Sequence, residues 1–319
     1  MKSKQEEERK VIVIVGPTAS GKSDLAVKIA KFINRFQKKF AVAGAEILSA
    51  DSRQIYKGLD LVSGKVPKEK GKKDYYYQEI KHHLLDIASP KKTFSVAQYQ
   101  KKGKEIIEKL FKENKIPIIC GGTGFYIDSL IYNLSFPAVK PQPKLRKKLE
   151  KLSLQELYQK LKKLDPQRAQ TIDKFNKRRL IRALEIVLAT QKPIPPLKKE
   201  RIFNTLKIGI LIEKKELSKK ILKRIKKRIN QGMIKEVQRL HRQGLSWKRL
   251  ESFGLELKWI SLYLQKKISL YQMINNLLKD ICQYAKRQMT WWKKEKDIHW
   301  IPFSEKKKAL DLVKSFLLN

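Results

Sequence analysis

The stretch Val11-Ile12-Val13-Ile14-Val15-Gly16-Pro17-Thr18-Ala19-Ser20-Gly21-Lys22-Ser23 decides the fold of this chain of 319 residues. A strand-length apolar run leads into the glycine-rich pattern G-x-x-x-x-G-K-[ST], and an amphipathic stretch, 23–36, follows it. This strand–loop–helix context indicates a phosphate-binding loop, because backbone N–H groups and the helix N-terminus attract phosphate oxygens. We predict that Gly16 to Ser23 bind a polyphosphate or pyrophosphate, with Lys22 supplying a cation and the Ser23 hydroxyl a ligand for Mg²⁺.

Short apolar runs recur along the chain between segments of helical periodicity. The predicted strands are 11–15, 46–50, 84–87, 116–120, 208–212 and 298–301, and a predicted helix at 94–114 has Ser95 as a capping residue. Alternating strands and helices predict an α/β fold with a mostly parallel sheet. Ligands of such sheets bind at the carboxyl ends of the strands. The phosphate loop, Asp51 and Gly121-Gly122-Thr123 should therefore converge on one crevice.

Prolines divide the chain into three segments. Prolines at 137, 141 and 143, and again at 193, 195 and 196, enclose a helical and basic stretch. We predict a P-loop α/β core beginning in residues 1–136, a helical insertion at 137–200, and the remainder of the core with C-terminal helices at 201–319. Within the last segment, helices are expected near 218–232, 234–243, 256–265 and 270–293.

The charge balance points to a polyanionic partner. Seventy-three Lys and Arg against 31 Asp and Glu give a net charge of +42, and such an excess is typical of nucleic-acid binding. A lysine-rich composition of the whole proteome is the alternative explanation. The arginine clusters at Arg178, Arg179 and Arg182, and at Arg224 and Arg228, favour a nucleic-acid surface over this alternative.

The remaining composition excludes several classes of protein. No apolar run is long enough for a membrane span, and residues 1–10 lack the apolar core of a secretion signal. Two cysteines, Cys120 and Cys282, provide neither a disulfide framework nor a zinc site, and we expect both to be buried thiols. These features together predict a cytoplasmic protein.

The predicted strand ends carry few of the acidic residues that ATP hydrolysis requires. The strand at 116–120 ends in Gly121-Gly122-Thr123-Gly124, and the strand at 46–50 is followed by Asp51-Ser52-Arg53-Gln54. A second acidic strand end of the kind that holds Mg²⁺ in many ATPases is missing from these segments. One carboxylate, Asp51, suits a transfer in which pyrophosphate leaves and the acid accepts a proton from the attacking group.

Ordered motifs over nearly the whole chain resemble those of the tRNA dimethylallyltransferases, the bacterial tRNA isopentenyltransferases. The phosphate loop alone is unspecific, whereas the ordered set is highly specific. Besides Gly16–Ser23, the matching segments are Asp51–Asp60, His82–Asp86, Phe94–Ala97, Gly121–Ile127, Arg178–Glu185 and Tyr284–Trp291.

The resemblance implies transfer of dimethylallyl from dimethylallyl diphosphate to the exocyclic amine of the adenosine 3′ to the anticodon. The acceptor tRNAs are those that read codons beginning with U, and the loop holds the donor's pyrophosphate rather than ATP. It implies Asp51 as the general base, Thr123 near the bridging oxygen and target base, and Lys22 on the leaving group. Mg²⁺ is the expected cofactor, and a monomer without membrane association is expected.

The resemblance also implies a tRNA-binding surface. The target base must leave its stack to reach Asp51, and Ser52, Arg53 and Gln54 would contact it. Arg146 would lie near the pyrophosphate or tRNA, and the block Lys286-Arg287-Gln288 beside the base channel. The block Arg178, Arg179, Leu180, Ile181 and Arg182 would meet the tRNA backbone. We expect Tyr284, Met289, Trp291 and Trp292 to belong mostly to the core, and His82 and His83 to serve packing and hydrogen bonding.

The chain departs from the family pattern in one late segment. Residues 251–256, Glu-Ser-Phe-Gly-Leu-Glu, lack the usual tyrosine and basic residue, so the contacts made there differ. Residues 63–67 also depart, although Lys65 and Pro67 persist. The cysteines of the eukaryotic zinc-finger extension are absent.

Three alternatives compete with this interpretation. A P-loop kinase predicts an arginine-rich lid and a pair of strand-end acids, neither of which is evident. An enzyme that prenylates free adenine nucleotides would not need a basic helical insertion. A non-catalytic nucleic-acid-binding module would not need an intact Gly21-Lys22-Ser23 together with Asp51 and Thr123. We therefore favour the tRNA prenyltransferase.

Overall fold

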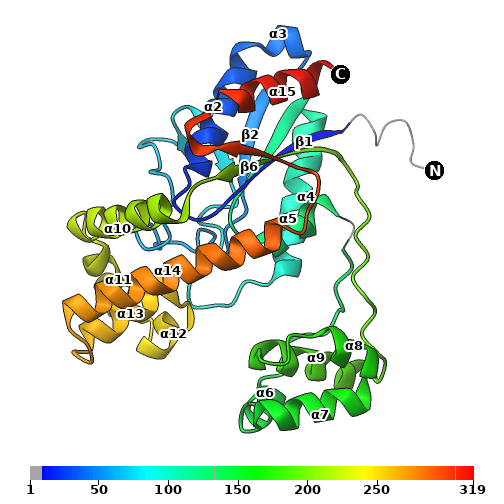
Figure 1. The fold of residues 1–319 in the computed structure, drawn as a ribbon, viewed down its shortest axis with the longest axis vertical. Coiled ribbons are helices and arrows are strands. Elements are labelled where there is room, and N and C mark those ends of the chain that lie inside the picture. Colours follow the sequence, from blue (N-terminus) through cyan, green and yellow to red (C-terminus); the bar gives the residue numbers. More distant parts are fainter. Residues whose placement is uncertain (1–8, 133, 306) are drawn as a thin grey trace. The chain divides into compact units, whose positions relative to one another are not determined.

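The computed structural model describes residues 9–132, 134–305 and 307–319, which fold as two compact units. The first unit comprises residues 9–132, 201–305 and 307–319, and the second comprises residues 134–200. The first unit contains a seven-stranded sheet of order β3-β4-β2-β5-β1-β6-β7 (Figure 1). Its strands are β1 (Lys10–Val15), β2 (Gly44–Ser49), β3 (Tyr76–Tyr77), β4 (Ile80–His83), β5 (Lys115–Cys120), β6 (Asn204–Leu211) and β7 (Ile298–Pro302).

The strand β1 lies inside the sheet, between β5 and β6, where both faces are covered. It pairs in parallel with β5 and β6, with Ile12 opposite Ile118 and Leu206. Every residue from Val11 to Val15 is fully buried, which explains the unbroken apolar run, because a doubly covered parallel strand needs no polar face. The β3–β4 hairpin is antiparallel, and the other neighbouring strands run parallel.

Helices cover the sheet and extend beside it. Residues of α2 and α15 share one apolar cluster with Ile12 and Ile14, while α4 and α5 pack on each other, with Gly103 leaving room for Leu130. Figure 1 shows α10 to α14 gathered beside the sheet. The helices of this unit are α2 (Lys22–Arg35), α3 (Gln37–Phe40), α4 (Val96–Lys112), α5 (Gly124–Ile131), α10 (Lys214–Asn230), α11 (Met233–Arg242), α12 (Trp247–Ser252), α13 (Leu255–Leu264), α14 (Leu270–Trp292) and α15 (Lys308–Leu318).

The second unit is built from helices around its own apolar cluster. Leu157 and Leu161 of α7 pack against Leu180 and Leu184 of α9 in this cluster. The four helices are α6 (Pro143–Glu150), α7 (Leu154–Leu164), α8 (Pro166–Thr171) and α9 (Lys177–Thr190). Side chains cap three of them, since Ser153, Asp165 and Asn176 each accept a hydrogen bond from the first turn of a following helix.

The structure confirms the α/β fold with a mostly parallel sheet, and it corrects some details. The strand predicted at 84–87 lies earlier, at β4, because Leu84 (φ 63°) and Asp86 (φ 55°) turn the backbone. The helices α3, α5, α12 and α15 and the hairpin strand β3 were not predicted. Ser95 caps α4 in a reciprocal capping box, as expected. Cys120 is buried, but Cys282 is only half-buried.

Candidate active site at the phosphate loop

The phosphate loop connects the buried end of β1 to the first turn of α2. Gly16 (φ 141°) and Gly21 (φ 77°) occupy backbone conformations that favour glycine, and a Cβ on Gly16 would lie 3.1 Å from the Ile210 carbonyl oxygen. Ala19 (φ 64°) shares this left-handed region although it carries a side chain, a strain that is typical of functional loops. Lys22 opens α2, and its Nζ donates to the Pro17 carbonyl oxygen at 2.6 Å.

The ends of β2 and β5 meet beside this loop, as the sequence predicted. Ala50 N donates to the Cys120 carbonyl oxygen at 2.9 Å, and Thr123 N donates to the Ala50 carbonyl oxygen at 3.0 Å. The backbones approach so closely that a Cβ on Gly121 would lie 2.2 Å from the Ala50 oxygen. Asp51 and Thr123 are thereby held next to each other at the strand ends.

Two hydrogen bonds order the turn that carries Asp51. Asp51 Oδ1 accepts from Arg53 N at 2.8 Å, and Thr123 Oγ1 accepts from Ser52 N at 3.1 Å. One Asp51 oxygen is therefore committed to the turn, and its other oxygen has no hydrogen-bond partner recorded among the described residues. A carboxylate so oriented has a free lone pair with which to take a proton.

A cavity of about 450 Å³ opens beside these residues. It has the size of a pocket for a small organic ligand. Its walls come from the phosphate loop, the Asp51 turn, α10, the α12–α13 junction and α14. The lining residues are Thr18, Asp51, Ser52, Arg53, Val62, Ser63, Arg224, Phe253, Gly254, Leu255, Glu256, Lys258, Asp280, Ile281, Tyr284 and Arg287.

Half-buried cations concentrate around the loop. Arg224 Nη2 donates to Thr18 Oγ1 at 2.7 Å, while Arg224 Nε is buried without a hydrogen-bond partner among the described residues. Burial lowers the pKa of Lys22 to about 8, and the neighbouring Arg224 contributes; burial and then Arg228 lower the pKa of Arg224 to about 9. Desolvation penalises a cation, and an anionic ligand would restore the lost solvation. The loop is therefore prepared for an anion.

A second arginine of α10 balances an acid of the cavity. Arg228 Nη1 lies 3.4 Å from Glu256 Oε1, and both side chains are about one-eighth exposed. Burial lowers the pKa of Arg228, and Glu256 partly offsets this effect. The two arginines thus differ, since Arg228 has a carboxylate partner and Arg224 faces the phosphate loop.

Gln288 of α14 joins the phosphate loop to the loop that carries Thr123. Its Oε1 accepts from Thr18 N at 2.8 Å, and its Nε2 donates to the Gly122 carbonyl oxygen at 2.9 Å. The side chain is 5 % exposed, and a Cβ on Gly122 would lie 2.0 Å from Nε2. The sequence block 286–288 indicated proximity to the site, but periodicity alone does not reveal this bridge.

The expectation for the aromatic residues of α14 is only partly met. Trp292 is buried, as expected, but Tyr284 lines the cavity. Burial raises the pKa of Tyr284 to about 12, and the Asp51 carboxylate adds to this effect. Tyr284 has the helical spacing of a core residue because it lies on the inward face of α14, and that same face continues into the cavity wall. The expected structural roles of His82 and His83 agree with their contacts to the Ile80 oxygen and to Glu46.

The residues predicted to contact the flipped base have different surroundings. Ser52 and Arg53 line the cavity, and the Arg53 guanidinium lies 5.5 Å from the Phe253 ring centroid. The Gln54 side chain is occupied elsewhere, because it bonds to Ser49 Oγ at 2.9 Å and to the Gly64 carbonyl oxygen at 3.2 Å. Gln54 therefore braces the turn rather than lining the cavity.

The predicted tRNA-binding residues of the second unit fall into three groups. Arg178 and Arg179 are exposed at the start of α9. Arg146 and Arg182 are half-buried, and both pair with the fully buried carboxylate of Glu185. Leu180 and Ile181 are buried in the apolar cluster, which corrects their assignment as nucleic-acid contacts, because their side chains form the core of the unit.

Several residues of the cavity were not assigned to the site from the sequence. Arg224 was noted as part of an arginine cluster, but its position beside the loop depends on a contact spanning 206 residues. Phe253 and Glu256 belong to the segment that departs from the family pattern, and they line the cavity. That departure is itself the signal that the segment contributes to this site.

The described residues contain no group of three or more His, Cys, Asp or Glu side chains that could hold a metal. Ser23, the residue predicted to hold Mg²⁺, follows Lys22 directly in the first turn of α2.

A glycine-rich loop at the carboxyl end of a mostly parallel sheet, faced by one carboxylate and half-buried arginines, defines an α/β protein with a candidate phosphate site. Residues 54–295 match the family model described as IPP transferase. The chain belongs to the IPP transferase family.

Two curated relatives show how far the similarity extends. The tRNA dimethylallyltransferase of Acetivibrio thermocellus is 38% identical over 319 residues, covering 96% of this chain and 97% of the relative. That of Anoxybacillus flavithermus is 37% identical over 301 residues, covering 93% and 91%. The likeness therefore includes the second unit and the C-terminal helices.

Solved structures share the fold. The tRNA isopentenylpyrophosphate transferase of Bacillus halodurans has a TM-score of 0.69 at 29% identity, with 97% of each chain covered. A eukaryotic dimethylallyltransferase described as acting on tRNA has a TM-score of 0.78 at 24% identity, covering 97% of this chain and 79% of that one. Within the residues described here, no helix is long and apolar enough to cross a membrane.

Proposed function

We propose that the chain is a tRNA dimethylallyltransferase. It transfers dimethylallyl from dimethylallyl diphosphate to the exocyclic amine of the adenosine 3′ to the anticodon, in tRNAs that read codons beginning with U. The observation that carries this proposal is the meeting of the phosphate loop, Arg224 and Asp51 at one cavity. The relatives' names support the same activity.

The phosphate loop and its cations act on the leaving group. Carbon–oxygen cleavage leaves positive charge on the allylic carbon and negative charge on the diphosphate, so donors aimed at the departing oxygens lower the barrier. In this proposal Lys22, the loop N–H groups and Arg224 Nε, which has no hydrogen-bond partner among the described residues, donate to the departing oxygens. Arg224 also fixes Thr18 in the loop, so its loss would disturb both charge and geometry.

Asp51 acts on the incoming amine. The exocyclic amine of adenine is a weak nucleophile because its lone pair is delocalised into the ring. As the nitrogen–carbon bond forms, the amine loses a proton, and the Asp51 oxygen not engaged by Arg53 N accepts it. Thr123 holds the Asp51 turn through Ser52 N and offers its hydroxyl to the target base or the bridging oxygen.

Mg²⁺ fits this donor set as an ion that would be held mainly by phosphate oxygens of the substrate. The Ser23 hydroxyl would hold it, with the remaining positions taken by diphosphate oxygens and water. When bound, it supplies positive charge that stabilises the departing diphosphate.

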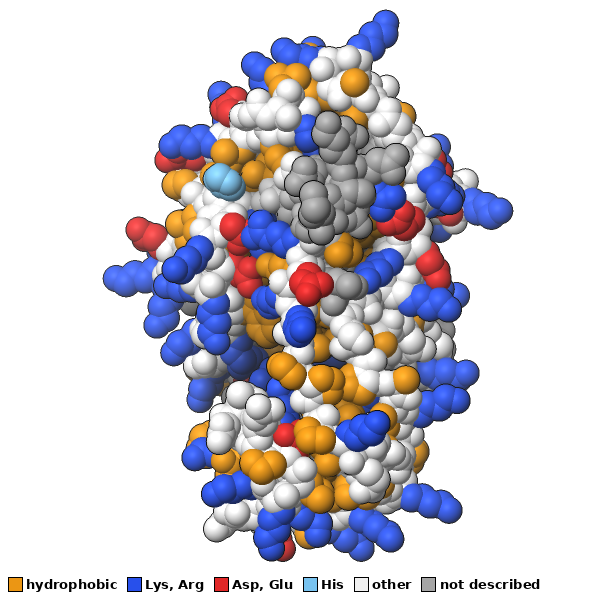
Figure 2. Space-filling view, turned by 90° about the vertical axis from the view of Figure 1, so that its right-hand side faces the viewer, with side chains coloured by type: hydrophobic (Ala, Val, Ile, Leu, Met, Phe, Trp, Pro, Cys, Tyr) orange, Lys and Arg blue, Asp and Glu red, His pale blue; other side chains and the backbone are white. Residues whose placement is uncertain are grey.

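The acceptor is a polyanion, and the protein surface matches it. Figure 2 shows many Lys and Arg side chains and few acidic ones on the face presented there. Phosphate contacts by such residues make affinity fall steeply with salt. Arg178 and Arg179 are exposed for backbone contacts in the second unit. We propose that the protein works as a monomer in the cytoplasm.

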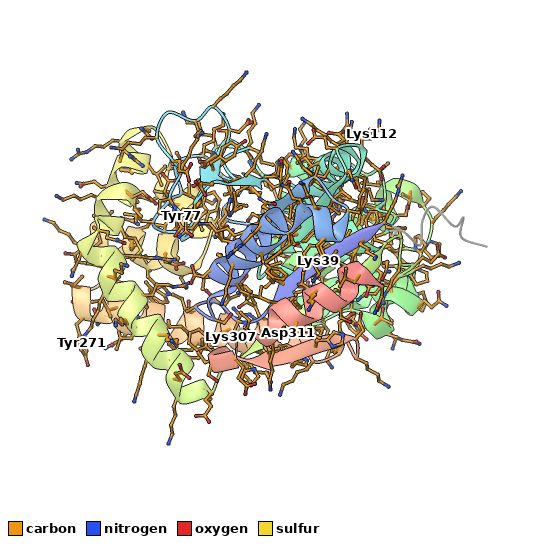
Figure 3. All side chains as sticks on the ribbon, turned by 90° about the horizontal axis from the view of Figure 1, so that it is seen from above. Lys39, Tyr77, Lys112, Tyr271, Lys307 and Asp311 are labelled. Atoms are coloured by element: carbon orange, nitrogen blue, oxygen red, sulfur yellow. The ribbon has the colours of Figure 1, made fainter. Side chains whose placement is uncertain are left out.

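Transfer of labelled dimethylallyl from its diphosphate to a tRNA with three consecutive anticodon-loop adenosines, with Mg²⁺, tests the proposal. The native chain should incorporate label, and Asp51→Ala should lose it. Asp311→Asn, an exposed acid on α15 (Figure 3), is the matched control and should retain activity. If the native chain incorporates no label but turns over ATP, the proposed function is wrong and the P-loop kinase alternative is favoured.

A further inference from the structure

Phe175 is an aromatic side chain that the second unit leaves in solvent. It is 77% exposed, whereas other large apolar residues of this unit, such as Leu157 and Leu180, are fully buried in its cluster. An exposed phenyl ring contributes nothing to that core. Its place just before α9 therefore raises the question of what contacts it.

The backbone around Phe175 is held by local hydrogen bonds. Asp173 Oδ1 accepts from Phe175 N at 3.2 Å, and the Asp173 carbonyl oxygen accepts from Asn176 N at 3.0 Å. Asn176 then caps α9, with its Oδ1 accepting from Arg179 N at 3.2 Å. A turn and a helix cap thus present the ring outward, which reduces the entropy lost when a ligand binds to it.

Cations flank Phe175 in sequence, and one of them lies over its ring. Lys174 Nζ lies 5.4 Å from the Phe175 ring centroid, and Lys177, Arg178 and Arg179 follow in the first turn of α9. The one acid of segment 173–179 is Asp173, whose carboxylate lies 3.9 Å from Arg179. The segment therefore keeps a clear positive excess beside an exposed π face.

We propose that Phe175 is a stacking platform for an unpaired base of the tRNA substrate, with the flanking cations on the adjacent phosphates. An aromatic ring beside basic side chains is the usual means of holding single-stranded RNA, since every base has a π face and every nucleotide a phosphate. Paired bases cannot stack on it, so the platform selects a loop. The positive charge disfavours a basic or neutral protein surface as the occupant. This inference rests on the proposed function.

Four substitutions in the full chain separate stacking from simple apolar contact. Phe175→Ala removes the ring, Phe175→Leu keeps apolar area without a π face, and Phe175→Tyr and Phe175→Trp keep the π face. Leu164→Ala, at a 42% exposed leucine of α7 in the same unit, is the matched control. The ligands are an anticodon stem-loop RNA with an unpaired loop and a fully paired RNA duplex of equal length.

The alanine and leucine variants should bind the stem-loop about 5- to 100-fold more weakly, as expected for the loss of one stacked base. They should raise KM for tRNA while kcat and KM for dimethylallyl diphosphate stay unchanged. The tyrosine and tryptophan variants and Leu164→Ala should resemble the native chain. Stem-loop RNA should quench the added tryptophan of Phe175→Trp beyond the change seen in the native chain, and duplex should not.

Native stem-loop affinity in Phe175→Ala, or equal rescue by leucine and tyrosine, would overturn the stacking platform while leaving the proposed function intact. A native chain that neither binds nor prenylates tRNA would instead overturn the proposed function, and this inference with it. Circular dichroism of each variant establishes that the helices of the second unit remain folded, so that a lost contact is distinguished from a lost fold.

Discussion

Replacing Gln288 by methionine tests whether the bridge between the two active-site loops serves catalysis. The substitution keeps the length and apolar stem of the side chain but removes both of its hydrogen bonds, to Thr18 N and to the Gly122 carbonyl oxygen. A buried polar group left without a partner costs about 1–3 kcal/mol. Gly122 is buried and Thr18 only half-buried, so we take about 2 kcal/mol for the first group and 1 kcal/mol for the second.

The loss of about 3 kcal/mol can raise the activation free energy of the reaction or lower the free energy of unfolding. If the bridge holds the donor loop in register with Asp51 and Thr123, the cost falls on the transition state and kcat decreases about 150-fold. If the bridge serves only the fold, the cost falls on the free energy of unfolding and kcat at saturation stays native. Gln288→Glu keeps an acceptor for Thr18 N but places a carboxylate against the Gly122 oxygen, so it should be no better than methionine.

The assay is steady-state prenyl transfer at saturating donor and tRNA, combined with thermal unfolding of each variant. Gln283→Met, an exposed glutamine of the same helix, is the matched control and should change neither quantity. A lowered melting temperature with native kcat in Gln288→Met would refute the catalytic argument. It would leave Gln288 as a residue that merely stabilises the packing of α14.

Three further predictions follow from named contacts. Gly122→Ala should lower kcat to a similar degree as Gln288→Met in the same assay, because the new Cβ would displace the amide of Gln288. The pKa of Lys22 is lowered to about 8, so the empty loop loses this charge as pH rises through 8. KM for dimethylallyl diphosphate should rise above pH 8, with proton uptake on binding measurable by calorimetry in buffers of different ionisation enthalpy, and Lys22→Met should lack both effects. Glu185→Gln should destabilise the second unit by about 1–3 kcal/mol, a value discounted because both arginine partners are partly exposed, and hydrogen exchange of α9 amides checks it. Burial opposes ionisation of Glu185, yet hydrogen bonds from Arg146, Gln142 N and Arg182 lower its pKa to about 2. The second unit of the native chain should therefore lose this stabilisation as pH falls from about 4.5 toward 2. The glutamine variant should show no such loss.

The central strands and the crevice were predictable because their signals are local. The apolar run 11–15 and the glycine pattern after it specify a buried strand and a phosphate loop without reference to the rest of the chain. Parallel pairing then brings the carboxyl ends of β1, β2 and β5 together. Asp51 and Thr123 follow from that topology alone, and their hydrogen bonds agree with it.

The edge of the sheet was less predictable because polar residues and turns dominate there. The strand β4 includes His82 and His83, which hydrogen-bond within the protein instead of forming an apolar run. The more apolar Leu84 and Leu85 follow it, but Leu84 has a left-handed backbone that ends the strand. The strand predicted at 84–87 from its apolar residues therefore lies four residues later in the chain than the strand β4 itself.

The rest of the site depends on contacts between distant segments. Arg224 reaches Thr18 across 206 residues, and Gln288 reaches the same residue across 270. Neither separation corresponds to a recognisable sequence motif. Arg224 and Gln288 lie on amphipathic helices, where a polar residue that points inward cannot be told from a surface residue by sequence alone. Leu180 and Ile181 show the converse, since apolar residues within a basic block belong to the core.

The placement of charge explains how a phosphate loop can serve alkyl transfer without a second acidic strand end. A phosphoryl transfer needs charge arranged around the phosphorus atom that is attacked, whereas in alkyl transfer the diphosphate only departs. Here the cations come from α2 and α10 on the loop side, and the carboxylate of Asp51 stands at the neighbouring strand end. Arg224 donates a hydrogen bond to the Thr18 hydroxyl, and Gln288 accepts one from the Thr18 backbone N–H. The C-terminal helices α10 and α14 therefore hold the loop at two atoms of Thr18. In the proposed reaction, a loop held in this way would keep its shape when the diphosphate leaves, so that the departing oxygens stay away from the attacking amine.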